Sequence, residues 1–92
     1  MKIVELPPAD DRLLRRSADL LAQLASRHGI TTVNLGDDPA ELVVTLETDR
    51  SYFDLVDFQA ETESLLQHRV AVTSTGAPEA HPREQLAPAP AA

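Results

Sequence analysis

The stretch that most constrains the fold runs from Thr31 to Glu47 and reads TTVNLGDDPAELVVTLE. Its two ends are short runs of β-branched and other apolar residues, which are typical of strands. Between them lies Gly36-Asp37-Asp38-Pro39, a strong turn signal. The second run, Glu41 to Glu47, carries apolar or neutral residues on both faces, which is typical of a central strand. The stretch predicts two strands joined by an acidic turn, and that turn is the candidate active site.

Two helices and a third strand are predicted around this stretch. Residues Asp10 to His28 place apolar side chains at three- and four-residue steps, and Gly29 follows where a left-handed C-terminal residue is expected. A second helix runs from Ser51 to about Gln67, with Asp54 in a capping-box position. Val70 to Thr73 is a short third strand. The strand–helix–strand order predicts a βαβ unit with a parallel pair of strands.

Residues 1–75 are predicted to form one α+β domain, with a three- to four-stranded mixed sheet and two main helices packed on it. Met1 to Leu6 is expected to be a short edge strand or an arm that ends at Pro7-Pro8. From Gly76 the sequence becomes GAPEAHPREQLAPAPAA, which is rich in Pro and Ala. Because this composition offers little apolar surface to bury, residues 76–92 are expected to be a disordered tail, or a segment that a partner orders.

The composition argues against several classes of protein. The net charge is −7, from 15 acidic residues against 8 basic ones, whereas a nucleic-acid-binding surface needs clustered Lys and Arg. The chain has no Cys and therefore no disulfides or thiolate metal sites. No apolar run approaches the roughly 20 residues of a membrane span, and no signal peptide is legible. We therefore expect a cytoplasmic protein that binds neither nucleic acid nor membrane.

Three carboxylates lie in or beside the central turn, those of Asp37, Asp38 and Glu41. Carboxylates that lie close together can hold Mg²⁺, which prefers oxygen ligands and binds substrate phosphates jointly with the protein. Their spacing suits this poorly, because Pro39 stands where the first acid of a pair ending at Glu41 is needed. The other interpretation is a turn rich in Asp because Asp forms Asx turns, and we favour it.

Several segments resemble the minimal nucleotidyltransferases of the polymerase-β-like superfamily. Arg50 to Gly76 reads RSYFDLVDFQAETESLLQHRVAVTSTG, close to the family's SLFDLxxLQxELExLLGRxVDVVT. His28 to Gly36 resembles the family's first strand, and Ala40 to Glu47 resembles the strand with its paired metal-binding Asp residues. Pro82-Arg83-Glu84 echoes the closing segment, so the resemblance covers Leu13 to Leu86. It implies a small nucleotidyltransferase-like domain.

The family's catalytic motif is missing from this chain. The motif is Gly-Ser-x-Ala-Arg-Gly followed by Ser-Asp-x-Asp, but here Gly36 leads directly into the turn. Pro39 falls at the first metal-binding Asp and Glu41 at the second, while the third carboxylate belongs within Val70-Ala71-Val72. Two-metal phosphoryl transfer needs these charges to hold Mg²⁺ against the substrate. The resemblance therefore implies a pseudoenzyme that uses neither Mg²⁺ nor ATP.

Members of this family act as antitoxins beside HEPN-type ribonuclease toxins, and active members transfer AMP from ATP to the toxin. The resemblance therefore implies a protein-binding module, the antitoxin of a toxin–antitoxin system with a HEPN-type toxin as its partner. The candidate contacts are Tyr52, Phe53, Val56 and the C-terminal tail. All three aromatic residues of the chain lie on this one helix, and at least one is expected to be exposed to a partner.

Two alternatives to this function stay open. The first is a residual Mg-dependent nucleotidyltransferase that transfers AMP from ATP to a partner protein through Asp37, Asp38 and Glu41. Glu41 is then the candidate metal ligand. The second is a subunit that lends its sheet edge or a helix face to a larger assembly or oligomer.

Overall fold

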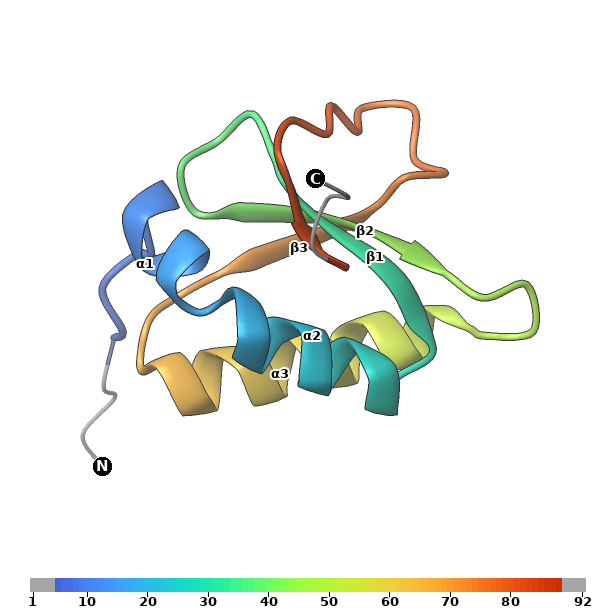
Figure 1. The fold of residues 1–92 in the computed structure, drawn as a ribbon, viewed down its shortest axis with the longest axis horizontal. Helices are drawn as coiled ribbons and strands as arrows, with labels where there is room; N and C mark the ends of the chain where they lie inside the picture. Colours follow the sequence, from blue (N-terminus) through green and yellow to red (C-terminus); the bar gives the residue numbers. More distant parts are fainter. Residues whose placement is uncertain (1–4, 89–92) are drawn as a thin grey trace.

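The computed structural model describes residues 5–88 and shows a mixed sheet with its helices on one face (Figure 1). The elements are, in order, α1 (Asp11–Arg16), α2 (Ala18–Arg27), β1 (Ile30–Leu35), β2 (Glu41–Leu46), α3 (Tyr52–Leu66), β3 (Ala71–Ser74) and β4 (Gln85–Ala87). The four strands lie in the order β3-β2-β1-β4. β1 is antiparallel to β2 and β4, and β2 is parallel to β3. The predicted α+β class, with a mixed sheet and two main helices, is confirmed.

β1 and β2 form an antiparallel hairpin at the centre of the sheet. The Gly36 N–H donates to the Glu41 carbonyl at 2.9 Å and closes the turn. Along β2, Leu42 and Val44 belong to the core under the helices, whereas Val43 points to the other face. All three side chains are fully buried. The prediction of a central strand over this segment is therefore confirmed.

The helix predicted over Asp10 to His28 is interrupted at Ser17 and becomes α1 and α2. Asp10 caps α1, since its Oδ1 accepts a hydrogen bond from the Leu13 N–H at 2.8 Å. Gly29 has φ +69°, the left-handed conformation expected after α2. Core side chains of the two helices are Leu14, Leu21, Leu24 and Ala25.

α3 begins at the predicted capping box. The Ser51 Oγ accepts from the Phe53 N–H at 3.3 Å, and the Asp54 carboxylate accepts from the Ser51 N–H at 3.0 Å. Satisfying these otherwise unpaired groups stabilises the helix start by about 1 kcal/mol. The inner face of α3 buries Leu55, Phe58 and Thr62. The helix connects the parallel strands β2 and β3, so the predicted βαβ unit is confirmed.

The chain after residue 75 returns to the sheet. Residues 75–84 cross on the side away from the helices, and Gln85–Ala87 then forms β4 beside β1 (Figure 1). Leu86 is 8% exposed and belongs to the core. The expectation of a tail over residues 76–92 is therefore corrected for this segment. The composition of residues 76–92 did not predict this strand, because β4 is short and places only one large apolar side chain, Leu86, in the core.

The two ends of the chain are described only in part. Residues 1–4 and 89–92 lie outside the described residues, and with them most of the predicted N-terminal strand or arm and the end of the predicted tail. Pro8 forms an isolated parallel bridge with Arg69, just before β3. The Arg69 N–H donates to the Pro7 carbonyl at 2.7 Å, and the Ala9 N–H donates to the Arg69 carbonyl at 2.9 Å.

The place of β4 in the core can be tested with Leu86→Ala. We expect it to lower the free energy of unfolding by about 2 kcal/mol or more, because it removes a buried side chain and leaves a cavity. Urea denaturation followed by circular dichroism measures the change. Leu65→Ala is the matched control, since Leu65 is 52% exposed, and its effect is expected to stay within about 0.5 kcal/mol. Equal stability of the two variants would contradict the core position of Leu86.

Candidate functional site

The turn between β1 and β2 does not gather its three carboxylates. Asp37 and Asp38 are exposed, whereas Glu41 is half-buried at the start of β2. The Glu41 side chain lies so close to Gly36 that a Cβ at this position would clash with its carboxylate. Its Oε2 accepts a hydrogen bond from the Thr73 Oγ1 of β3 at 3.2 Å. Glu41 is thus a structural link between the turn and β3.

This arrangement bears on the predicted residual active site. Within residues 5–88, no group of three or more His, Cys, Asp or Glu side chains is placed to hold a metal ion. In the parallel pair of β2 and β3, Glu41 lies opposite Ala71. The residue that pairs with Glu41 in β3 is therefore Ala71, which has no carboxylate to form a pair with that of Glu41. Asp37, Asp38 and Glu41 do not form a metal-binding cluster in this geometry.

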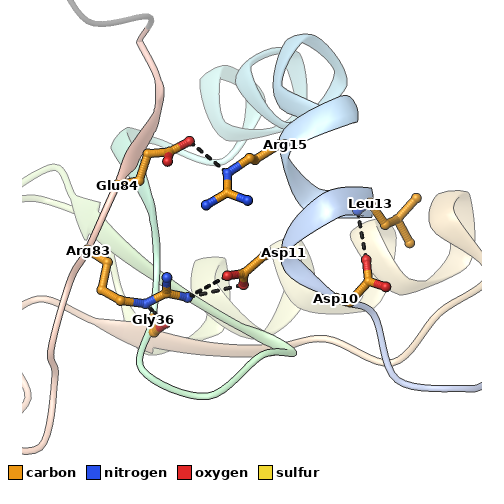
Figure 2. A network of polar contacts seen from close by, with 7 residues as sticks. All are labelled: Asp10, Asp11, Leu13, Arg15, Gly36, Arg83 and Glu84. Atoms are coloured by element: carbon orange, nitrogen blue, oxygen red, sulfur yellow. Dashed lines mark hydrogen bonds and ion pairs between the residues drawn. The ribbon is translucent and has the colours of Figure 1, made fainter.

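Arg83 holds the turn from the C-terminal side. Its Nε donates to the Gly36 carbonyl, and its Nη2 lies 3.1 and 3.2 Å from the two carboxylate oxygens of Asp11 (Figure 2). The Arg83 backbone N–H also donates to the Leu35 carbonyl at 2.7 Å. One residue thus ties together the turn, the first helix and the segment that leads into β4.

A second ion pair lies beside Arg83. The Arg15 Nε donates to the Glu84 carboxylate at 3.0 Å (Figure 2). The Leu35 N–H donates to the Glu84 carbonyl at 2.9 Å. The hydrogen bond that Arg15 donates to Glu84, and then the charge of Glu84, raise the pKa of the Arg15 guanidinium. Both side chains are about half exposed, so this pair contributes little to stability.

The sequence contained one signal for this network, the resemblance of Pro82-Arg83-Glu84 to the family's closing segment. It did not indicate the contacts of Arg83, because Asp11 is 72 residues away along the chain. The candidate active-site turn is therefore held by long-range polar contacts from both sides, Thr73 on one and Arg83 on the other. These contacts engage the Gly36 carbonyl and the Glu41 carboxylate, whereas Asp37 and Asp38 stay exposed.

The predicted partner contacts lie on the outer surface of α3. Tyr52 is 72% exposed, Phe53 76% and Val56 41%. Ala60, one turn after Val56, is exposed as well, and we call these four residues the outer stripe. The third aromatic residue, Phe58, is fully buried and meets the His28 ring edge-on at 6.2 Å. The expectation that at least one aromatic side chain is exposed is confirmed.

The outer stripe makes α3 apolar on two opposite sides. A helix at the surface of a small domain normally turns charged and polar residues away from the core. α3 buries Leu55 and Phe58 on one side and still exposes Phe53 and Val56 on the other. Isolated exposed apolar residues are ordinary, but a contiguous group of large ones marks an interaction site.

A groove adjoins the outer stripe, between the first turn of α3 and the edge strand β3. It encloses about 300 Å³. Its lining consists of Tyr52, Leu55, Val72, Thr73, Ser74, Ala77 and Glu79. Tyr52 belongs to both features, so the outer stripe and the groove form one continuous surface. Sequence reasoning missed the groove, because its three walls come from segments that meet only in the folded chain.

The charges around this surface are acidic. Between Ser51 and Gln67 the chain has four carboxylates and no Lys or Arg; the four are Asp54, Asp57, Glu61 and Glu63. The neighbouring Arg50 lies 3.8 Å from the Glu47 carboxylate and 3.6 Å from that of Asp54. Its charge is therefore offset by two acids, and the surface as a whole suits a basic partner.

Among residues 5–88, no helix combines the length and the apolar character needed to cross a membrane. Comparisons with protein-family models, with curated proteins and with solved structures find no match to this chain.

The structural role of Arg83 can be tested with Arg83→Ala. We expect a loss of about 1 kcal/mol in the free energy of unfolding, because the substitution removes an ion pair and a charged hydrogen bond to the Gly36 carbonyl. Thermal or urea denaturation measures it. Arg12→Ala, on the exposed side of α1, is the control and is expected to change stability by less than about 0.5 kcal/mol. Equal stability of Arg83→Ala and the native chain would show that the network is dispensable.

Proposed function

We propose that this protein is a catalytically inactive, nucleotidyltransferase-like module of the cytoplasm that binds a protein partner through the outer stripe of α3. The observation that carries the proposal is the exposure of Phe53, at 76%, beside Tyr52 and Val56. Burying apolar surface is favourable by about 25 cal/mol per Å², so a partner that covers these side chains gains affinity from them. Aromatic residues are also enriched among the contacts that dominate binding energy.

The register of the sheet supports the inactive assignment. The resemblance to the nucleotidyltransferases places the third metal-binding carboxylate within Val70-Ala71-Val72, and Ala71 lies opposite Glu41 across β2 and β3. A carboxylate at position 71 would adjoin that of Glu41, as a shared metal ion requires. The backbone arrangement is therefore compatible with the resemblance, while the charges that the chemistry needs are missing.

A HEPN-type ribonuclease toxin is the proposed partner. This assignment comes from the resemblance, and the charge of the chain supports it. A ribonuclease must present basic surface to RNA, because binding to the phosphate backbone requires Lys and Arg. A partner with net charge −7 complements such a surface and can compete with RNA for it.

Co-expression with the protein encoded by the adjacent gene tests the proposal. We expect a complex, and Phe53→Glu should weaken it about 30-fold, because loss of a central aromatic contact costs about 2 kcal/mol or more. Isothermal titration calorimetry with the two purified proteins measures the affinity. Leu65→Glu is the matched control, since it places the same charge on another exposed apolar site of α3. No complex, or equal weakening by both substitutions, would contradict the outer stripe as the contact.

Titration with Mg²⁺ and ATP separates this proposal from a residual nucleotidyltransferase. We expect no Mg²⁺-dependent binding of ATP. Among residues 5–88 the Glu41 carboxylate belongs to no group of three possible metal ligands, and it accepts a hydrogen bond from Thr73. Calorimetry of the native chain and of Glu41→Ala measures this. Asp19→Ala, at an exposed acid of α2, is the control. Mg²⁺-dependent ATP binding that only Glu41→Ala abolishes would establish an active site.

A further inference from the structure

The outer edge of β3 exposes backbone groups that can pair with another strand. The N–H groups of Ala71 and Thr75 point inward, since they donate to Ala40 and Val44 at 2.8 Å each. Along a strand, the N–H and carbonyl groups of successive residues point alternately to its two sides. The N–H groups of Val72 and Ser74 and the carbonyl of Val72 therefore point away from β2, toward the open edge of the sheet. Among residues 5–88, the backbone of Arg69, just before β3, forms hydrogen bonds with Pro7 and Ala9 on this side of the chain; no strand pairs with the outer edge of β3 itself.

The opposite edge of the sheet is protected, and β3 is not. β4 has only three residues and is followed at once by Pro88, which has no N–H to donate. β3 reads Ala-Val-Thr-Ser and contains no charge and no Pro. Short edge strands, charges and Pro are the usual protections of sheet edges against other chains. β3 is also short, with four residues, but it has neither charge nor Pro. Such an edge, next to an apolar groove, has the features of a site for strand addition.

The groove and the outer stripe supply the side-chain contacts for such a strand. Tyr52 and Leu55 form one wall, from α3, and Ala77 and Glu79 form another. A strand laid along β3 would direct alternate side chains toward the α3 wall. The exposed ring of Tyr52 connects this wall to Phe53, so one extended segment can bond to the edge and cover part of the stripe.

We propose that β3 receives an extended, basic segment of the protein partner as a fifth strand of the sheet. The segment combines apolar side chains, which enter the groove beside Tyr52, with a Lys or Arg side chain that meets Glu79, the exposed acid of the groove lining. The inference rests on the proposed function, because it describes how the same partner engages the chain.

Charge decides between this occupant and a second copy of the chain. Pairing of β3 with β3 of another copy would bring two surfaces of the same acidic kind together. Each copy carries a net charge of −7 and has no Lys or Arg between Ser51 and Gln67. Like charges that meet at an interface oppose binding, whereas a basic segment is attracted to Glu79 at the groove.

Amide-resolved NMR of the full-length, ¹⁵N-labelled chain tests the inference. The probes are three synthetic peptides of equal length: alternating Val and Lys, alternating Val and Glu, and the Val–Lys peptide with every second amide N-methylated. We expect the Val–Lys peptide to shift the amides of Val72 and Ser74 and to slow their hydrogen exchange. N-methylation should weaken binding at least about 10-fold, because it removes the main-chain hydrogen bonds. The Val–Glu peptide should not bind.

A pair of variants tests the charge contact in the same titration. Glu79→Lys should weaken binding of the Val–Lys peptide about fivefold, because it replaces attraction by repulsion next to the groove. Asp19→Lys changes the net charge equally but lies on α2, and it should leave the affinity unchanged. Equal effects of the two variants would show that only net charge matters and would overturn the proposed contact.

Three other outcomes also overturn the inference. They are the absence of binding by the Val–Lys peptide, equal binding of its N-methylated form, and shifts confined to Phe53 and Val56. A dimer of the native chain in sedimentation, with Val72 and Ser74 in its interface, would identify a second copy as the occupant. None of these results bears on the complex with the adjacent-gene product, which Phe53→Glu tests separately. The two proposals can therefore fail independently.

Discussion

The antiparallel pairing of β1 and β2 is the interaction on which the rest of the structure depends. It places Leu42 and Val44 under the helices and Val43 on the other face, so both sides of the hairpin must be covered. α2 and α3 cover one side. On the other, a hydroxyl ladder crosses the strands, with Thr45 bonded to Thr32 at 2.7 Å and to Thr75 at 3.2 Å. Residues 75–84 also cross on that side (Figure 1).

A central hairpin leaves two outer edges, and the chain treats them differently. On the β1 side, β4 completes the sheet, and Arg83 secures the segment before it through Gly36 and Asp11 (Figure 2). On the β2 side, β3 ends the sheet without such protection and borders the groove beside α3. The Gly36 carbonyl and the Glu41 carboxylate are thus bonded within the fold, while outward-facing backbone groups and exposed aromatic side chains lie at β3 and α3. This asymmetry places the proposed binding surface away from the turn.

Features that depend on neighbouring residues were predictable from the sequence. The capping box of Ser51 and Asp54, the left-handed Gly29 and the central strand each follow from a few adjacent side chains, and each is present in the structure. β4 was not predictable in this way, because its pairing partner β1 lies some 50 residues earlier and Leu86 is its single large core side chain. The proximity of Glu41 to Ala71 and Thr73 of β3 was not predictable for the same reason, because these residues are about 30 positions away along the chain.

The two main helical segments, the strands β1 to β3, the α+β class and the acidic character of the chain were predictable from the sequence, because periodicity, caps and charge are local or additive properties. It also indicated that aromatic residues on α3 could serve a partner. Which of them are exposed depends on tertiary packing, since α3 is apolar on two sides and packing buries Phe58 while leaving Phe53 exposed. The open edge of β3 and the absence of a second carboxylate opposite Glu41 in β3 likewise depend on which strands become neighbours. Strand pairing joins residues that are distant in sequence, and no local pattern records that choice.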